Sequence, residues 1–484
     1  MSLARSTALL DEKNTLTSSV TDKYRLAGKI TQTCLQHIIQ TVLTQYETYT
    51  VGEMCRMGDE FLERATTAVY KSVAEKGIAQ PVRIEKQEFV GGVSPDNGDK
   101  FQGGMLAPGD LVKISLGVYI DGYTAQVTQT EVVRHVPNTS AGETEQPLTG
   151  SPADAVCASY LASEAVIAYL AQVTDPNPGK AVGVVTGTKI RELVEKIAAA
   201  YHVKIVPGSS VRRIRRFLAG QHDIVLERDY KGVLWEVEGE EERALHAVKL
   251  AESEAKQEST EGAVCLYEQH IEEEENFTVE AGEAYQVDIQ MAAAPQKGAI
   301  RLYDFQGYDE SGTVINQYGR DFSVTYGLKI QASRKLLSQL EATTSVYPFK
   351  LSHVESNVAK ARLGLGEILA HQILVPIPVK VAKFVPLAAL YEFSKNSKAR
   401  ARDEASKAVP VARNSSSVLL TNDACLRLTG GQAFPPPYVH SAFELPEDVT
   451  NLLKLVGHKH GAKVKDVLPG DVDMAPAKEA KMEE

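Results

Sequence analysis

The sequence has few cysteines and no long hydrophobic run. Its five cysteines are scattered, odd in number and without a CxxC pair, at Cys34, Cys55, Cys157, Cys265 and Cys425. This spacing argues for a reducing compartment and against a structural zinc site. No run of about 18 apolar residues occurs, so we expect no membrane-spanning segment. Residues 1–13 are polar and lack the apolar stretch of a secretory signal.

Positive charge is also in the minority. The chain has 52 Lys and Arg against 63 Asp and Glu, which gives a formal net charge of −11. This balance disfavours non-specific nucleic-acid binding by the whole surface, although it allows a local basic patch. Hydrophobic residues make up 43% and charged residues 24%, as is typical of a soluble globular protein with a sizeable core.

Hydrophobic periodicity divides the chain into helical and extended stretches. Apolar residues at roughly helical spacing predict helices within 21–76, at Ala155–Val173 and at Val184–Tyr201. Alternation rich in Val, Ile, Tyr and Thr predicts strands in Met105–Val133, with a hairpin turn at Asp121–Gly122.

The second half of the chain continues this alternation. We expect strands at Val203–Leu226 and Glu283–Ala292, and a helix that begins near Arg334. The order of helices, antiparallel strand pairs, helices and strands indicates a single α+β domain with insertions.

Composition sets the expected boundaries of this domain. We expect an N-terminal extension at 1–20, one domain at 21–430 with insertions near 137–152 and 229–275, and a C-terminal extension at 431–484. The 229–275 insertion is acidic and ends in the run Glu272–Glu275, which we interpret as a solvated surface rather than a docking site. The chain after about residue 470 is expected to be disordered.

Several stretches resemble one known family. They are "GIAQPVRIEKQEFVGGVSP" and "LAPGDLVKISLGVYIDGYTAQVTQT" within Gly77–Val133, "FTVEAGEAYQVDI" at Phe277–Ile289, and "KARLGLGEILAHQILVP" at Lys360–Pro376. Their order and local pattern resemble the methionine aminopeptidases of the pita-bread fold. The similarity is greatest to the non-peptidase branch, the ErbB-binding-protein-like group. It covers most of residues 20–430.

The resemblance implies where the metal-binding side chains of the active members would lie. In those members two Asp, one His and two Glu hold a pair of divalent ions, which create a hydroxide and stabilise the tetrahedral intermediate. The two Asp positions hold Ser115 and, eleven residues later, Gln126, and the metal-binding His position holds Ser209.

The remaining implied positions are equally altered. Asp288 stands at the first Glu position, Ser415 at the second, and Gly92 where an assisting His is expected. A slip of one residue would replace Ser415 by Asn414 or Ser416, and neither is charged. Because neutral oxygens cannot offset the repulsion between two divalent ions, we expect no metal cofactor and no peptidase activity. The alternative is a different alignment with ligands elsewhere, but no histidine lies near a suitably spaced Asp pair.

Two basic clusters are candidate contacts for rRNA. The first, in "VRRIRRF", consists of Arg212, Arg213, Arg215 and Arg216. Arginine forks match phosphate oxygens and give sequence-independent affinity. The alternative is that the acidic insertion Glu236–Glu275 neutralises them internally. The second, in "KNSKARARDEASK", consists of Lys395, Lys398, Arg400 and Arg402.

The resemblance also implies a function. The non-peptidase branch includes cytoplasmic ErbB-binding-like adaptors and fungal-type factors that escort the large ribosomal subunit out of the nucleus. The enlarged acidic insertion and the mixed tail favour the export-factor type. We therefore expect a shuttling monomer that contacts rRNA and exit-tunnel proteins of the pre-60S particle, and export would require contacts with nuclear-pore Phe-Gly repeats. The alternatives are a divergent metallo-aminopeptidase and an adaptor that holds a partner's peptide.

Overall fold

The computed structural model describes residues 12–134, 146–175, 184–219, 230–239, 241–246, 275–307, 312–390, 406–455 and 463–470. Its centre is a ten-stranded sheet whose main path runs β1-β2-β3-β13-β7-β5-β6. These strands are β1 (Lys76–Lys86), β2 (Leu111–Ile120), β3 (Tyr123–Val132), β13 (Val411–Leu420), β7 (Ala284–Ala292), β5 (Ser210–Ile214) and β6 (Gly232–Leu234). Strand β4 (Lys204–Ile205) pairs with β7, and β14 (Cys425–Arg427) pairs with β13. Neighbours on the main path are antiparallel.

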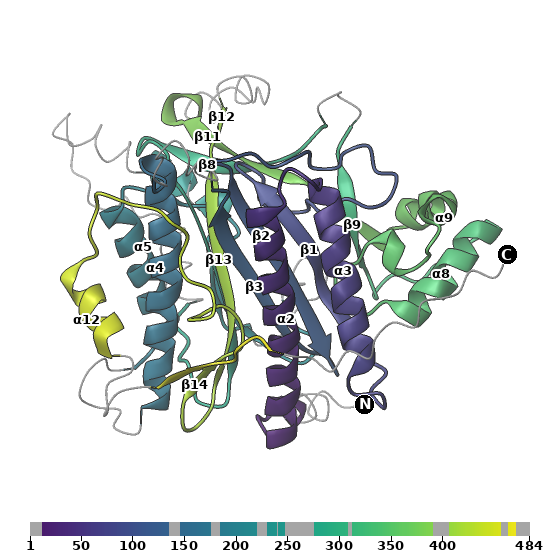
Figure 1. Cartoon of the computed structure of the whole chain (residues 1–484), viewed down its shortest axis with the longest axis horizontal. Coiled ribbons are helices and arrows are strands. Elements are labelled where there is room, and N and C mark those ends of the chain that lie inside the picture. Colours follow the sequence, from purple (N-terminus) through teal and green to yellow (C-terminus); the bar gives the residue numbers. More distant parts are fainter. Residues whose placement is uncertain are drawn as a thin grey trace, which may run out of the picture.

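Four long helices cover one face of this sheet (Figure 1). They are α2 (Ser18–Thr44), α3 (Val51–Ala68), α4 (Ser151–Ala171) and α5 (Gly187–Ala200). Side chains start two of them, because Thr17 caps α2 and Thr50 forms a capping box with Glu53 at the start of α3. Helices α2 and α3 pack on β1 to β3, whereas α4 packs on β13 and β7.

The alternation along the strands separates a helix-covered face from a polar face. On β2 the residues Ile114, Leu116 and Val118 are buried under the helices in the main hydrophobic core. Because successive residues of a strand point to opposite faces, Lys113 and Ser115 point the other way. The polar residues of β2, β3, β13 and β7 therefore share the face opposite the helices.

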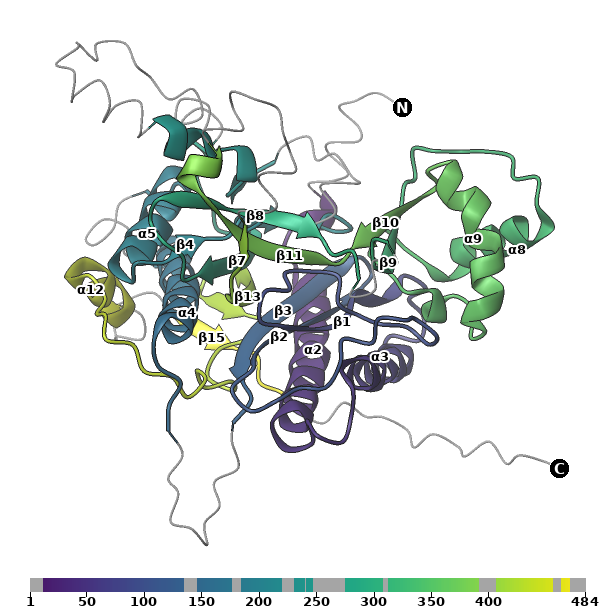
Figure 2. The same ribbon diagram turned by 90° about the horizontal axis from the view of Figure 1, so that it is seen from above.

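Smaller elements lie on the polar side of the sheet and at one end of it (Figure 2). The strands β8 (Gly298–Asp304), β11 (Lys380–Pro386) and β12 (Lys407–Ala408) form a three-stranded sheet. Beside it a small lobe with its own hydrophobic core contains β9 (Ile315–Arg320), α8 (Gln331–Thr343), η3 (Leu351–His353), α9 (Val358–Ala370) and β10 (Leu374–Pro378).

The described part of the expected C-terminal extension is integrated into the domain. Helix α12 (Glu447–Leu455) packs against α4, and β15 (Val464–Asp466) joins the main sheet parallel to β14. The backbone of Gly470 exchanges hydrogen bonds with the Thr33 hydroxyl on α2. The chain thus returns to the sheet more than thirty residues after the boundary expected near 430.

Other expectations can be compared with the structure directly. The α+β class is confirmed, and the turn at Asp121–Gly122 joins β2 to β3 with both residues at positive φ, as a tight hairpin requires. Helix α8 begins at Gln331, three residues before the expected start. The tips of both expected insertions lie outside the described residues.

One described segment, Ser151–Thr174, has the length and hydropathy of a membrane span. Of its most apolar window 72% is buried inside the protein, against the sheet and α5. Its hydrophobicity is that of a core helix.

Candidate functional site: a degenerate pocket on the polar face

The register of the sheet aligns most of the implied ligand positions. Ser115 lies opposite Thr128, and Thr128 opposite Ser415. Ser415 lies opposite Asp288. Gln126 lies two residues before Thr128 on the same face. The structure thus brings Ser115, Gln126, Asp288 and Ser415 together on the polar face, and we call this place the degenerate pocket.

The other two implied positions lie at its margins. Ser209 directly precedes β5, and its hydroxyl donates to the backbone oxygens of Val206 and Gln290 at 2.7 and 3.2 Å. Gly92 has φ +83°, and a Cβ there would lie 2.8 Å from the backbone oxygen of Pro378. Because no side chain fits at Gly92 without a shift of the backbone, this position cannot hold a histidine in the present fold.

The neutral side chains of the pocket satisfy one another. The hydroxyls of Ser115 and Thr128 are 2.9 Å apart. The amide of Gln286 donates to Ser415, and its oxygen accepts from Ser417 at 2.5 Å. Ser115, Thr128, Ser415 and Ser417 therefore each have a hydrogen-bond partner within the chain.

The one carboxylate among the implied ligands is bound by an arginine. Arg413 donates from Nε and Nη2 to the two oxygens of Asp288, at 2.8 and 2.6 Å. Each side chain is only 12% exposed. Burial opposes the charged guanidinium, but the neighbouring carboxylate outweighs it and raises the pKa of Arg413. Arg413 precedes Ser415 by two residues, so strand periodicity places it on the pocket face.

Three more charged residues lie beside this ion pair. Arg83 is opposite Ser115 in the register, and Glu85 is opposite Lys113. Lys113 donates to two backbone oxygens, at 2.7 and 3.0 Å, and burial lowers its pKa to about 8. Glu85 is fully buried.

A pair of divalent ions does not fit this donor set. Such ions require several anionic or imidazole ligands. The implied positions offer three serine hydroxyls, one amide, one glycine and one carboxylate that is already held by Arg413. Within the described residues, no group of three or more His, Cys, Asp or Glu is arranged to hold a metal ion.

Most arginines of the cluster are buried or paired with carboxylates of the chain. Arg212 and Arg213 lie in strand β5, so this part is extended and not helical. Arg213 donates to Glu283 at 3.2 Å, and Arg216 pairs with Asp121 at 2.5 Å. Arg213 and Arg215 are each 8% exposed. Arg213 and Arg216 are therefore paired within the chain, with Glu283 and Asp121, which lie outside the acidic insertion 236–275. The second basic cluster, Lys395, Lys398, Arg400 and Arg402, lies outside the described residues.

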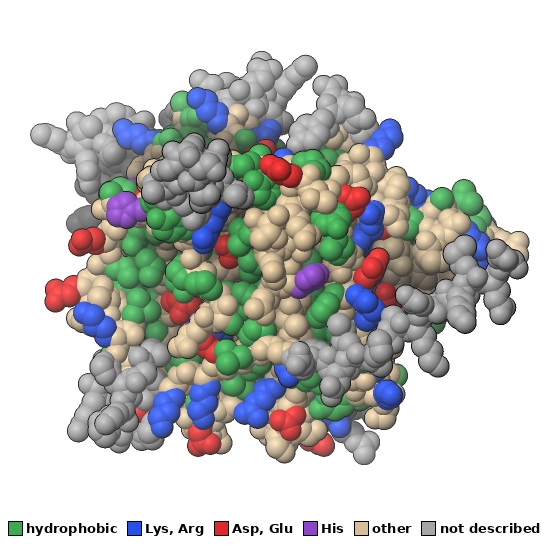
Figure 3. All heavy atoms as spheres, in the orientation of Figure 1, with side chains coloured by type: hydrophobic (Ala, Val, Ile, Leu, Met, Phe, Trp, Pro, Cys, Tyr) green, Lys and Arg blue, Asp and Glu red, His purple; other side chains and the backbone are tan. Residues whose placement is uncertain are grey.

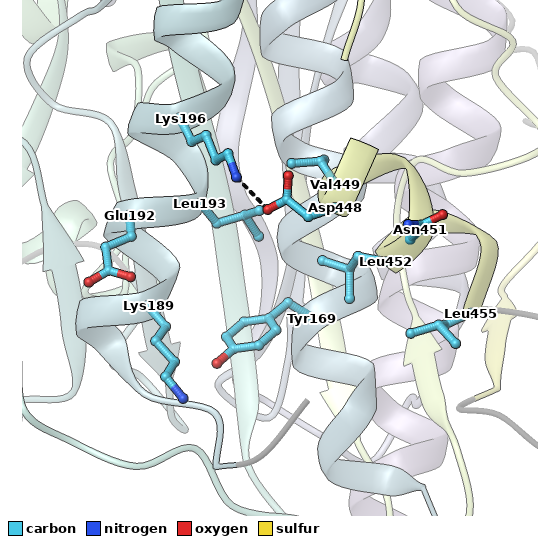
Figure 4. A pocket seen from close by; sticks show the side chains of 10 residues that line it. All are labelled: Tyr169, Lys189, Glu192, Leu193, Lys196, Asp448, Val449, Asn451, Leu452 and Leu455. Carbon is cyan, nitrogen blue, oxygen red and sulfur yellow. Dashed lines mark hydrogen bonds and ion pairs between the residues drawn. The ribbon is translucent and has the colours of Figure 1, made fainter. Parts of the chain in front are cut away.

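A separate pocket of about 520 Å³ lies on the helix-covered side, between α5 and α12 (Figure 4). Leu193, Leu452 and Leu455 point toward it, and an ion pair of 2.5 Å between Lys196 and Asp448 bridges the two helices. Its lining combines apolar side chains with the charged groups of Lys189, Glu192, Lys196 and Asp448.

The polar face of an antiparallel sheet, with paired helices behind it and most of the implied ligand positions on its strands, defines a pita-bread aminopeptidase fold. No protein-family model matches the chain. The solved structure of a thermophilic Arx1 superimposes with a TM-score of 0.63 and 19% identity, over 90% of this chain and 98% of that one. At this identity the likeness shows the fold.

Sequence comparison also identifies the family. The chain is 34% identical to the probable metalloprotease ARX1 of Debaryomyces hansenii, over 95% of both chains. It is 33% identical to the protein of the same name from Saccharomyces cerevisiae, over 91% of this chain and 90% of that one. The chain therefore belongs to the Arx1 family, and the resemblance to pita-bread aminopeptidases is confirmed.

Proposed function

We propose that this protein acts by binding and does not hydrolyse peptides. The observation that carries the proposal is the bidentate ion pair between Arg413 and Asp288, because it occupies the single carboxylate left at the implied ligand positions. Restoring a metal site would require breaking this buried pair and supplying several new anionic ligands.

The name of the relatives, probable metalloprotease, supports the rival function. A peptidase of this fold would retain metal at a defined stoichiometry and release an N-terminal Met. We expect elemental analysis of the purified chain to find no stoichiometric zinc, manganese or cobalt. We also expect no release of Met from a short peptide when these ions are added. Stoichiometric metal together with Met release would refute the proposal.

We propose further that the binding partner is the large ribosomal subunit, at the pre-60S stage and near the exit tunnel. In this role the protein would assist maturation and export while it shuttles between nucleus and cytoplasm. The resemblance to the non-peptidase branch supports this assignment. A cytoplasmic ErbB-binding-like adaptor is the alternative, and it predicts complexes that depend on protein contacts alone.

The lobe of α8 and α9 is the described surface best suited to rRNA. Between Ile315 and Ile377 the sequence holds six Lys and Arg, besides the buried Lys350, against four Asp and Glu, although the whole chain is acidic. By contrast, basic and acidic side chains are interspersed over the helix-covered side (Figure 3). Phe322 and Tyr326 are 48% and 41% exposed on the lobe. The combination of cations with exposed aromatic rings is typical of surfaces that bind unpaired nucleotides.

Two contacts organise this lobe surface. The guanidinium of Arg320 lies 4.6 Å from the ring centroid of Phe322, and Tyr326 stacks on His371 at 3.5 Å. On the helices, Lys335 and Lys360 are so close that a hydrogen bond and the charge from Lys360 lower the pKa of Lys335. A phosphate group placed between these two exposed ammonium groups would relieve their repulsion.

The test exchanges charge on this surface. We expect Lys335→Glu/Lys360→Glu to weaken co-sedimentation with large-subunit precursors by about tenfold, with a shallower salt dependence, because phosphate contacts are lost. Lys71→Glu/Lys454→Glu is the matched control, since it changes the same number of exposed lysines elsewhere. Equal loss in both variants would refute the role of the lobe. Binding that resists both salt and RNase would favour the adaptor.

A further inference from the structure

The proline-rich segment 435–438 lies outside both the degenerate pocket and the lobe. Its sequence is Pro-Pro-Pro-Tyr. A proline fixes its own φ at about −65°, and it also keeps the residue before it out of the α-helical region. Phe434, Pro435 and Pro436 each precede a proline, so the backbone here is restricted to extended conformations. The three prolines belong to no helix or strand, as expected of a polyproline II helix.

The exposure of the four residues follows the period of such a helix. Because a polyproline II helix has about three residues per turn, Pro435 and Tyr438 lie on one face. Pro435 and Pro436 are exposed, and Tyr438 is 45% exposed. Pro437, which points in another direction, is buried. The segment thus rests on the protein through Pro437 and presents its other side chains to solvent.

Contacts on both sides hold the segment in place. Phe434 is buried in the main hydrophobic core, and Val439 packs against the core under α4 and α5. The N–H of Leu148 donates to the carbonyl of Tyr438 at 3.1 Å, and the carbonyl of Leu148 accepts from the N–H of His440 at 2.8 Å. Because the chain is fixed at both ends, little conformational entropy would be lost when a partner binds.

The segment also keeps its binding groups available. Within the described residues, no hydrogen bond engages the carbonyl oxygens of the three prolines. The guanidinium of Arg134 lies 5.7 Å from the ring centroid of Tyr438. Such a cation–π contact is weak at an exposed site, so a tighter contact with a partner can replace it.

This arrangement fits one class of partner. Grooves lined by aromatic side chains bind proline-rich segments in the polyproline II conformation, and they occur in SH3-type and WW-type domains. An SH3-type groove takes prolines at the first and fourth positions, but the fourth position here is Tyr438. A WW-type groove takes Pro-Pro-x-Tyr, in which the third residue faces away, as Pro437 does. A rigid connector would explain the prolines, but it would not require an exposed tyrosine on the face of Pro435.

We propose that segment 435–438 is a docking site for a WW-type domain of a partner protein. Pro435 and Pro436 lie in its aromatic groove, and Tyr438 enters the adjoining pocket. The pairing with Leu148 places the site beside the start of α4, whereas Figure 1 shows the lobe of α8 and α9 beyond α3. A domain bound here would therefore leave the lobe accessible, and the site is independent of the proposed ribosome binding.

Calorimetric titration of the full chain tests this proposal. The titrants are a recombinant WW domain that binds Pro-Pro-x-Tyr peptides and, separately, an SH3 domain that binds Pro-x-x-Pro peptides. We expect the WW domain alone to bind, at least as tightly as it binds a free peptide of residues 432–442, because the chain already holds the segment in place. Absence of WW binding to the chain would overturn the proposal, and equally tight binding of the SH3 domain would overturn the assignment to this class.

Variants identify the side chains responsible. Tyr438→Ala and Pro435→Ala should each weaken WW binding at least about tenfold, because each removes an anchor of the complex. Tyr230→Ala is the matched control, since it removes a tyrosine of similar exposure, 40% against 45%, outside the segment. Unchanged affinity in Tyr438→Ala, or an equal loss in the control, would overturn the proposal. If Tyr438→Ala melts at a lower temperature than the unaltered chain, Pro435→Ala decides, and unchanged affinity there would overturn it as well.

Discussion

The variant Arg413→Met tests whether the carboxylate of Asp288 is held in a buried ion pair by Arg413. In Arg413→Met the carboxylate of Asp288, whose side chain is 12% exposed in the unaltered chain, would lose its two hydrogen bonds of 2.8 and 2.6 Å. Breaking one side of a buried ion pair costs about 3–5 kcal/mol, because the remaining charge is uncompensated. We therefore expect the free energy of unfolding to fall by about that amount.

A double-mutant cycle separates this pair from simple loss of packing. Asp288→Leu alone should also destabilise the fold, since it leaves Arg413 buried and unpaired. The double variant should regain most of the loss, because an apolar pair replaces the ion pair. Urea titration followed by the fluorescence of Trp235 gives the free energies, since it is the one tryptophan in the chain and fully buried. A loss below about 1 kcal/mol in Arg413→Met would refute the reasoning, as it would mean a solvated carboxylate that is free to bind metal.

Three further predictions concern other buried sites. Burial raises the pKa of Glu131 to about 7 from 4.5, so its bound proton stabilises the fold at low pH, and this contribution is lost as the pH rises from about 4.5 to 7. Glu131→Gln should flatten that decline and raise the melting temperature at alkaline pH, and an unchanged pH profile would contradict this. Gly92→Ala should cost more in a urea titration than Gly109→Ala, since both have positive φ but a Cβ meets backbone only at Gly92. Lys350→Met should cost about 3–5 kcal/mol by breaking a fully buried pair, whereas Lys196→Met, at an exposed pair, should cost at most about 1 kcal/mol.

The sequence was sufficient to predict which strands carry the pocket. Residues two apart on a strand share a face. The positions of Ser115 and Asp288 therefore indicate which residues of β2 and β7 point to the pocket face. By the same rule Arg413, which lies two residues before Ser415, can be predicted to share the pocket face. Its partner was not predictable, because the pairing joins residues 125 positions apart.

The surroundings of the arginine cluster, in contrast, could not be predicted from the sequence. Its composition suggested an exposed basic patch, but β5 is an inner strand between β7 and β6, and the acceptors of Arg213 and Arg216 come from distant strands and turns. A variant with every arginine of the cluster changed to Glu would therefore disturb folding as well as any RNA contact. The lysines at 335 and 360 avoid this problem because both are exposed.

The pocket lies on the sheet of the aminopeptidase fold, and Arg413 neutralises the carboxylate of Asp288 there. In a metal-dependent relative two divalent ions would neutralise the carboxylates on this floor. Here one carboxylate remains at those positions, and Arg413 holds it through two hydrogen bonds. A single restored ligand, such as Ser115→Asp, would add a negative charge next to Arg83 and form an ion pair before it attracted a metal ion. We therefore expect that binding of divalent ions at these positions would require both arginines to be replaced together with several new ligands.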